Sequence, residues 1–521
     1  MSDNYHSNSQ KTDDRFQTLL NNANAARTIS QAVEGTIGPK GLDIMMVDGF
    51  GDVVISNDGV TILKLMEVSH PSARMIINTA RAQHIEVGDG TTTATIIAGA
   101  LVAEGADQVL KGVPVTHIIE GIIKGTTAAV DLIRQQTRRI NSIEDESLLA
   151  IAAIAGRGHQ NLADLIIKGA KLMGIEKVLS PDYKLADAVI ARESAANSVF
   201  RGIIVNKEPA NKQMPVIIEK PRILVIDDAL GPENINDEAM KTEAGFHYYL
   251  KAREKYEQSL VKICDMDINL VVIDRGIDDI AEEIFTQRGI MVLQRVSSRE
   301  LENLCRHTGA KKIKRNTINR EIKSLEEYLG TARLVEVDEK LQHTCVYDGA
   351  GENWATIIIG ASTEEIADER ERIAKDAASA VQAALQGGIV PGGGALEIWL
   401  AAHLEDLAKE FEGMESFGLL CVKEAVVKPF CCMAANSGFN PLEKLRNVLA
   451  AQRKHEVDYI SFDSENGNLI NVMEQGIIDP SLVKIHAIKA AGEVAVAILR
   501  INTIIKMKDE KLNINNIQDF K

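Results

Sequence analysis

The sequence predicts a multidomain fold with α and α/β parts, on three observations. With 521 residues, the chain is too long for a single hydrophobic core, and typical domain sizes suggest about three domains. Helical periodicity covers residues 16–33 and 71–137 and returns from about residue 368. Between about 206 and 352, apolar runs of strand type alternate with helical patterns, which is typical of an α/β layer with a largely buried sheet. A mixed region, 141–205, precedes this layer, so the order is that of one domain inserted into another.

The composition excludes several classes of function. Lysine and arginine number 58 against 74 acidic residues, a net charge of -16, so the overall field repels nucleic acid and anionic membranes. The six cysteines form no C-x-x-C pair and no zinc-ligand spacing with histidine, so a reducing cytosol fits best. The first twenty residues lack the order of a signal peptide, and no apolar run reaches the roughly 18 residues of a membrane span. We expect a cytoplasmic protein that binds neither nucleic acid nor membrane.

The helical first block is broken at several places. GTIGPKG (35–41) ends the first helix with three glycines and a proline. The following run, DIMMVDGFGDVVISNDGVTIL, predicts a β-hairpin around a Gly-Phe-Gly turn. The helical region 71–137 is interrupted at VGDGTTT and again at KGVP.

In the α/β block, RILVIDDAL, INLVVIDRGI and GIMVLQRV predict buried strands. The charged excursion between the first two strands has helical spacing, and aromatic residues gather in it. This pattern predicts either an exposed, adhesive tip or a helix that packs its aromatics on its own domain. The residues concerned are Phe246, Tyr248, Tyr249, Leu250, Tyr256, Leu260 and Ile263. Further on, Gly387 and Gly388 end another helix.

EVGDGTTTATIIAGALVAEG (86–105) opens a helix with a Gly-Asp-Gly-Thr-Thr-Thr turn. A helix N-terminus carries unpaired N–H groups and partial positive charge, which suit phosphate, and glycines with neighbouring threonine hydroxyls improve the fit. Asp89 fits there if Mg²⁺ lies between its carboxylate and the phosphates, because Mg²⁺ prefers one or two carboxylates plus phosphate oxygens. The alternative is a helix cap made by aspartate and threonine.

No Walker A motif and no G-x-G-x-x-G in a strand-to-helix context occurs, so ATP would have to bind by another design. TIGPKG (36–41), NDGVT (57–61) and VPGGGALE (390–397) also combine glycine with polar or acidic neighbours. Each stretch alone is typical of a simple turn. Their joint presence favours a phosphate site.

Six stretches stand in the order and spacing seen in chaperonins. They are TIGPKGLDIMMVD, ISNDGVTILK, HPSARMI, VGDGTTTATIIAGALV, GIDDIAEEIFTQRGIMVLQRV and GGIVPGGGALEI. From about residue 20 to 505, the chain most closely resembles the group II type, the archaeal thermosome and its eukaryotic cytosolic relatives. The resemblance implies a chaperonin fold with three domains. These are a mainly α-helical equatorial domain (1–140 and 391–521), a small α/β intermediate domain (141–205 and 353–390) and an α/β apical domain (206–352) with a helical lid protrusion over about 229–262.

The resemblance also implies an ATP site in the equatorial domain, with Asp89 as the ligand of Mg²⁺ and with K⁺ as a further candidate ion. The phosphates would lie on two of the glycine turns, and the ribose and base would lie against the third turn and Asp479, which by pattern alone is a turn acid. The residues expected to contact the nucleotide are Thr36, Ile37, Gly38, Pro39, Asp89, Gly90, Thr91, Thr92, Thr93, Gly392, Gly393 and Asp479.

Hydrolysis needs a group that orients the attacking water. Asp376 lies inside an alanine-rich helix, where a lone acid ordinarily faces solvent. The resemblance identifies Asp376 as the catalytic aspartate, carried by the intermediate domain, and Asp58 as the second acid near the γ-phosphate. Hydrolysis would then require the intermediate domain to close onto the nucleotide.

The chain departs from the group II pattern at two places. Where these chaperonins carry a lysine in T-G-K-G that senses the γ-phosphate, the chain has AGRGH, with Arg157 at that place. Arginine keeps the charge but presents a planar fork instead of a point charge, so the sensing role is left open. The C-terminal KMKDEKLNINNIQDFK lacks the glycine- and methionine-rich tail common in relatives. Both departures indicate an outlying prokaryotic branch.

The resemblance implies an ATP-dependent chaperone that captures unfolded polypeptide in a chamber. The chamber would be a homo-oligomer of two stacked rings with eight subunits each, closed by its own lid without a separate co-chaperonin cap. Two apical helices would form the client groove, with Ile284, Phe285, Leu301 and Leu304 either facing it or buried in the core. The alternatives are a small-molecule phosphotransferase and a ring scaffold that binds nucleotide without hydrolysing it.

Overall fold

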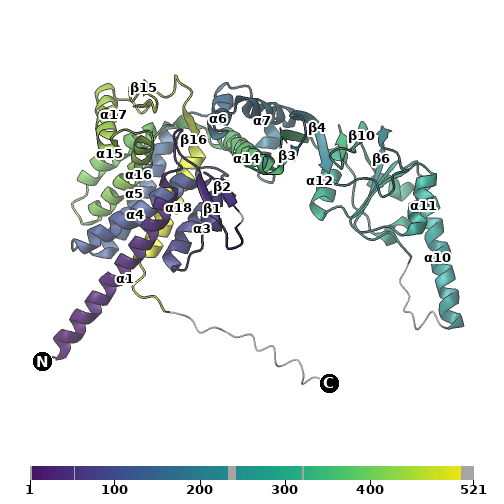
Figure 1. The fold of residues 1–521 in the computed structure, drawn as a ribbon, viewed down its shortest axis with the longest axis horizontal. Coiled ribbons are helices and arrows are strands. Elements are labelled where there is room, and N and C mark those ends of the chain that lie inside the picture. Colours follow the sequence, from purple (N-terminus) through teal and green to yellow (C-terminus); the bar gives the residue numbers. More distant parts are fainter. Residues whose placement is uncertain (1–2, 52, 233–241, 320–321, 506–521) are drawn as a thin grey trace. The chain divides into compact units, whose positions relative to one another are not determined.

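The computed structural model describes residues 3–51, 53–232, 242–319 and 322–505 (Figure 1). The chain forms two compact units, residues 1–139 with 386–521 and residues 140–385. Part of the predicted lid, 233–241, and the C-terminal stretch 506–521 lie outside the described residues. Among the helices described, none has the length and apolar character needed to cross a bilayer.

The first unit is mainly helical, as the periodicity predicts. Its helices are α1 (Asp3–Glu34), α2 (Gly59–Leu65), α3 (Pro71–Glu86), α4 (Thr91–Leu110), α5 (Val115–Gln136), α15 (Ala395–Lys409), α16 (Glu415–Asn436), α17 (Pro441–His455) and α18 (Ser481–Leu499). Its strands form three short antiparallel pairs, β1 (Ile44–Val47) with β2 (Val53–Ser56), β13 (Ile389–Pro391) with β16 (Ile478–Pro480), and β14 (Ile460–Phe462) with β15 (Leu469–Asn471). The predicted hairpin and the two predicted helix breaks are confirmed.

Helix α4 lies at the centre of this unit and contacts α1, α3, α16 and α18, so it is apolar on most of its circumference. Small residues allow the helices around it to pack closely. A Cβ atom at Gly121 of α5 would lie 2.0 Å from the backbone oxygen of Glu415 and 2.6 Å from the Cα atom of Gly418 in α16. The backbones of α5 and α16 therefore touch at their crossing.

The second unit combines helices with two sheets. Its helices are α6 (Ser147–Ala155), α7 (Gln160–Met173), α8 (Ile175–Val178), α10 (Glu243–Cys264), α11 (Asp279–Gln287), α12 (Ser298–Thr308), α13 (Ile322–Leu325) and α14 (Glu364–Gly387), with 3₁₀ turns at Leu185–Ala188, Arg315–Asn319 and Glu326–Tyr328. Its strands are β3 (Val189–Glu193), β4 (Ser198–Val205), β5 (Ile217–Glu219), β6 (Arg222–Ile226), β7 (Leu270–Ile273), β8 (Met291–Leu293), β9 (Gly330–Thr331), β10 (Leu334–Asp338), β11 (His343–Tyr347) and β12 (Ala355–Ala361).

The three predicted apolar strands lie side by side in one sheet. Strands β6, β7 and β8 are parallel, β9 adds an antiparallel edge, and the order is β8-β7-β6-β9. A second sheet has the order β3-β12-β4-β11-β10-β5, in which only β3 and β12 are parallel. All residues of β7 and β8 are buried, which explains their unbroken apolar sequence. The predicted α/β layer is confirmed.

The aromatic segment between β6 and β7 forms helix α10, and each of the two expectations holds for part of it. Tyr256 is buried, and its hydroxyl donates hydrogen bonds to the carbonyl of Leu230 and to the carboxylate of Asp278. Phe246 and Tyr248, nearer the start of α10, are 51% and 56% exposed. One end of the helix thus packs on its own unit, and the other presents aromatic side chains to solvent.

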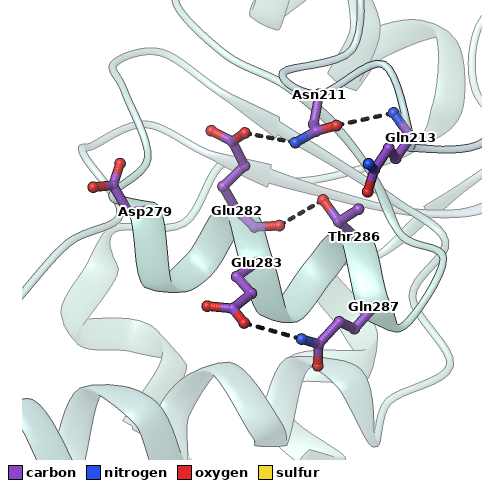
Figure 2. Close-up of a pocket in the computed structure, with 7 residues that line it drawn as sticks. All are labelled: Asn211, Gln213, Asp279, Glu282, Glu283, Thr286 and Gln287. Atoms are coloured by element: carbon purple, nitrogen blue, oxygen red, sulfur yellow. Dashed lines mark hydrogen bonds between the residues drawn. The ribbon is translucent and has the colours of Figure 1, made fainter.

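The apolar residues of α11 and α12 belong to the core. Phe285, Leu301 and Leu304 are fully buried, and Ile284 is half-buried. Of the two alternatives for these residues, burial in the core therefore holds for Phe285, Leu301 and Leu304, and the client groove does not. The outer face of α11 is polar instead and lines a shallow hollow (Figure 2). The hollow is lined by Asn211, Gln213, Asp279, Glu282, Glu283, Thr286 and Gln287.

Gly121→Ala is expected to lower the thermal unfolding midpoint, measured by differential scanning calorimetry. The added methyl group would collide with the backbone of α16, and overpacking costs about 1–3 kcal/mol or more, whereas alanine adds only about 1 kcal/mol of helix propensity. Gly49→Ala is the control, because no atom lies within 4 Å of the added Cβ atom. Equal midpoints for the two variants would show that the crossing of α5 and α16 relaxes freely.

Candidate functional site

The turn of Thr36, Ile37, Gly38 and Pro39 follows α1 and is held by an amide side chain. Gly38 has a φ of +88°, in the left-handed region that favours glycine. The Nδ2 group of Asn436, at the end of α16, donates to the carbonyls of Glu34 and Ile37 at 2.9 and 3.0 Å. The turn is therefore tied to α16, a contact that the sequence pattern did not reveal.

The threonines that follow Asp89 begin α4. The residue before the helix is Gly90, with a φ of +76° and no side chain that could accept hydrogen bonds from the first turn. Asp89 instead accepts a 2.6 Å hydrogen bond from the N–H of Gly90 itself. The alternative of a helix cap made by aspartate and threonine is therefore wrong, and the start of α4 has no side-chain cap, so its first N–H groups remain for an anion.

Gln83, a buried residue of α3, holds this second turn. Its Nε2 group donates to the carbonyl of Asp89 at 2.8 Å and to that of Val483 at 3.1 Å. Its Oε1 atom lies 2.6 Å from Nδ1 of His486. A Cβ atom at Gly90 would come within 2.5 Å of Val483. The turn therefore lies directly against α18 and has little freedom to shift.

Asp89 is half-buried, and burial raises the pKa of its carboxyl group to about 6. The negative charges of Asp479 and Asp58 also raise the pKa, while the N–H of Gly90 and the ammonium of Lys484 lower it. A carboxylate in such surroundings is stabilised by an added cation, because the cation offsets both the lost hydration and the neighbouring negative charges.

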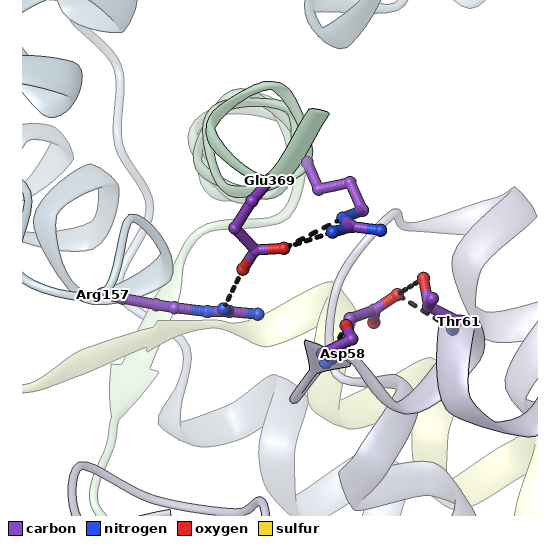
Figure 3. Close-up of polar contacts among 6 residues, drawn as sticks. Asp58, Thr61, Arg157 and Glu369 are labelled. Atoms are coloured by element: carbon purple, nitrogen blue, oxygen red, sulfur yellow. Dashed lines mark hydrogen bonds and ion pairs between the residues drawn. The ribbon is translucent and has the colours of Figure 1, made fainter. Parts of the chain in front are cut away.

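Asp58 caps helix α2. Its carboxylate accepts from the N–H groups of Val60 and Thr61 and from the Thr61 hydroxyl, at 3.3, 3.0 and 2.6 Å (Figure 3). The Thr91 hydroxyl donates to it at 3.4 Å. A Cβ atom at Gly59 would lie 2.5 Å from the hydroxyl of Thr92. The structure therefore brings the turns at 57–61 and 89–93 into contact.

Gly392, Gly393 and Asp479 meet where β13 pairs with β16. Val390 faces Asp479 across the ladder, and a Cβ atom at Gly392 would lie 3.2 Å from the Asp479 carboxylate. The turn ends at Gly394, with a φ of +80°, and α15 begins after it. As with α4, a left-handed glycine precedes the helix.

Met433 of α16 connects this turn to the first one. A Cβ atom at Gly38 would lie 2.8 Å from the Cγ atom of Met433, and one at Gly394 would lie 3.1 Å from its Cε atom. Within the first unit, the four glycine turns singled out in the sequence are thus linked in two pairs, 36–41 with 390–397 through Met433 and 57–61 with 89–93 directly.

One charged residue of this site, Lys484, has no counterpart among the sequence predictions. Lys484 of α18 lies 2.6 Å from Glu397 and 2.8 Å from Asp479. The available signal was weak: Lys484 is one of few charged residues in the apolar stretch SLVKIHAIKAAG.

Arg157 and Asp376 lie in the second unit. Arg157 has a φ of +53°, and its guanidinium group pairs with Glu369 of α14 at 2.8 Å (Figure 3). Glu369 and Asp376 are seven residues apart, about two helical turns, so they share one face of α14. Asp376 is half-buried. Arg157 is thus anchored to the helix face that carries Asp376.

Within the described residues, His117, Glu120 and Glu415 are grouped closely enough to hold a metal ion. The ammonium of Lys124 lies 3.1 Å from each of the two carboxylates. A lysine therefore already supplies the positive charge at that place, away from the glycine turns.

Comparisons with known proteins agree in pointing to one family. Residues 29–509 match the model of the TCP-1/cpn60 chaperonin family. The chain is 35% identical to a thermosome subunit of Pyrococcus horikoshii and 34% identical to one of Pyrococcus abyssi, each over 94% of this chain and 91% of the relative. A crystal structure of a group III chaperonin in the open state has a TM-score of 0.88 and 43% identity, covering 95% of this chain and 100% of that one.

Gln83→Leu is expected to destabilise the first unit and to loosen the turn at Asp89. Without the amide, the carbonyls of Asp89 and Val483 lose their donor, and a buried unsatisfied group costs about 1–3 kcal/mol. A lower thermal unfolding midpoint measures the effect. Gln475→Leu, at an exposed glutamine of the same unit, is the control. Equal midpoints for the two variants would contradict a structural role for the Gln83 amide.

Proposed function

Since the chain belongs to the TCP-1/cpn60 chaperonin family, we propose that its linked glycine turns form the ATP site of a protein-folding chamber. The chain is an ATP-hydrolysing chaperonin of the group II type. The observation that carries the assignment of the site is that the four turns lie in one unit in two linked pairs, 57–61 with 89–93 by direct contact and 36–41 with 390–397 through Met433. The phosphotransferase and non-hydrolysing scaffold alternatives receive no support from the family match.

The phosphates would lie on the turn Thr36–Pro39 and on the N–H groups at the start of α4. Two features support this placement: Gly90 leaves the start of α4 without a side-chain cap, and the turns are tied down by Asn436 and Gln83. Gly392 and Gly393 would lie against the base and ribose, with Asp479 accepting hydrogen bonds from the ribose hydroxyls.

Mg²⁺ would bind to Asp89, the one carboxylate placed directly before the phosphate-facing helix. The crowding of Asp89 by Asp58 and Asp479 supports a cation there. The ion would neutralise charge on the phosphate oxygens, with K⁺ as a second ion for the same phosphates. Asp58, held by its hydrogen bonds to α2, would keep the Thr91 hydroxyl oriented beside the γ-phosphate.

Asp376 would accept a proton from the attacking water and orient its oxygen toward the γ-phosphorus. Arg157, at the place of the family's γ-phosphate-sensing lysine, would contribute through its ion pair with Glu369, which shares the α14 face with Asp376. When the γ-phosphate is bound, the planar guanidinium group of Arg157 would leave the carboxylate of Glu369 and pair with the phosphate instead.

The proposed domains are an equatorial domain of 1–140 and 391–521, an intermediate domain of 141–205 and 353–390, and an apical domain of 206–352. The lid over about 229–262 would include the exposed aromatics Phe246 and Tyr248 of α10.

The chamber would be two stacked rings of eight identical subunits in the cytoplasm, without a separate cap. Native mass spectrometry tests this arrangement, since sixteen chain masses are expected; the mass of a single chain would refute it.

The chain would belong to an outlying branch of the group II relatives. Its identity to the group III chaperonin chain, 43%, exceeds the 34% and 35% to the two Pyrococcus thermosome subunits.

The carboxylates on the outer face of α11 would give the client surface of the apical domain a polar, acidic character.

Asp376→Asn is expected to retain ATP binding and to lose at least about a hundredfold in phosphate release, the usual contribution of a positioned general base. The steady-state ATPase rate and calorimetric ATP binding are measured together. Asp368→Asn, an exposed position on the same helix, is the matched control. Unchanged turnover in the Asp376 variant would remove this residue from catalysis.

Acidification is expected to weaken Mg-ATP binding through Asp89. Because the pKa of Asp89 is raised to about 6, a proton competes with the cation below that pH, and apparent affinity falls by up to about tenfold per pH unit. Asp89→Asn should bind Mg-ATP weakly at neutral pH and lose this part of the pH dependence. Calorimetric titrations at several pH values compare the two proteins, and equal pH profiles would refute Asp89 as the metal ligand.

A further inference from the structure

Lys484 joins two carboxylates that come from different elements of the first unit. Its ammonium lies 2.6 Å from Oε1 of Glu397, in the first turn of α15, and 2.8 Å from Oδ2 of Asp479, in β16. The side chains of Lys484 and Glu397 are only 12% and 4% exposed. Such a buried arrangement is sensitive to the loss of any partner, because each remaining charge would be left uncompensated.

The charge state of Lys484 is secured by its partners. Burial by itself lowers the pKa of a lysine, but Asp479 and Glu397 outweigh that effect and hold the pKa of Lys484 above its ordinary value. The ammonium is therefore present throughout the physiological pH range. It acts as a permanent hydrogen-bond donor to both carboxylates.

Asp479 is restrained on two sides. Its Oδ2 atom is taken by Lys484, and the backbone of Gly392 approaches so closely that a Cβ atom there would lie 3.2 Å from the carboxylate. Its other oxygen, Oδ1, accepts no hydrogen bond from the residues that the structure describes. One oxygen is thus fixed by the protein, and the other remains for a donor from outside the chain.

Glu397 anchors the lysine from the opposite side. Its Oε1 atom accepts from Lys484, while its Oε2 atom is buried and has no hydrogen-bond partner among the described residues. Burying a carboxylate with one oxygen unsatisfied is unfavourable for stability alone. Glu397 lies three residues after Gly394, so it connects the lysine to the glycine turn beside Asp479.

We propose that Lys484, anchored by Glu397, is a positioning residue that makes the site selective for nucleotides with both ribose hydroxyls. It holds one oxygen of Asp479 so that the other oxygen meets the vicinal hydroxyls of the sugar. The inference rests on the proposed ATP site and adds sugar selectivity to it. A site built to accept a hydroxyl donor rejects the analogue that lacks it, because its own acceptor is then left unpaired.

Equilibrium binding of ATP and 2′-deoxyATP to the full chain, with saturating Mg²⁺, tests the inference. The parent is expected to prefer ATP by about tenfold or more, the value of a hydrogen bond to a charged acceptor. Asp479→Ala should abolish the preference. Lys484→Met, which keeps the length of the side chain and removes the charge, should reduce the preference to the same level. Lys484→Arg should restore part of it.

The outcomes separate the inference from the proposed function. If Lys484→Met weakens both nucleotides equally and the preference persists, the lysine is merely structural and the inference fails. If Asp479→Ala keeps the preference, the ribose assignment of the proposed site fails instead. If Lys484→Met does not fold, two other variants take its place in the binding test. They are the double variant Lys484→Met with Asp479→Ala and the single variant Glu397→Gln. The double variant should match Asp479→Ala, and Glu397→Gln should lower the preference; an unchanged preference in Glu397→Gln would refute the anchoring role.

Discussion

An excess of negative charge around one buried ammonium is the constraint on which the site depends. The charges of Asp479 and Asp58 add to the burial that raises the pKa of Asp89, and Lys484, which pairs with Asp479 and Glu397, acts against them. A triphosphate would add further negative charge to this region, in a chain that is already strongly acidic. Backbone N–H groups at helix starts supply partial positive charge, and a divalent cation supplies the remainder. This balance explains why glycine turns and carboxylates occur side by side.

A second common feature is an amide side chain, buried in Gln83 and Gln452 and half-buried in Asn436, that donates to two backbone carbonyls. Asn436 holds the turn after α1, Gln83 holds the turn before α4, and Gln452 donates to the carbonyls of Ala395 and Ile460 beside the third turn. Glycine turns have high conformational freedom in isolation. Each amide restricts one of them from a neighbouring helix, so that the anion-facing N–H groups keep their direction before any ligand arrives.

The sequence by itself determined the local elements and the family. Helical and strand periodicities predicted α4, α5 and the buried strands β6, β7 and β8, because these patterns depend only on which face of a segment is buried. The turn at Asp89 was recognisable for another local reason: its Gly88 and Gly90 have left-handed backbone, which favours glycine. The quoted motifs were specific enough to predict a chaperonin, and the family match agrees.

Only the tertiary structure decided which side chains meet. Lys484 and Glu397 are 87 residues apart, and neither carries a local signal that it would pair with the other. Phe285 and Leu301 fit the pattern of a binding face as well as that of a core, and packing against neighbouring elements buried them. The alternative of a helix cap at Asp89 was likewise open in the sequence, and the structure places Gly90 before α4 without a side-chain cap. Whether a side chain is buried, and which side chain it pairs with, depends on segments that are distant in the chain. A local sequence pattern therefore leaves several arrangements open, and the packing of the whole fold determines which one forms.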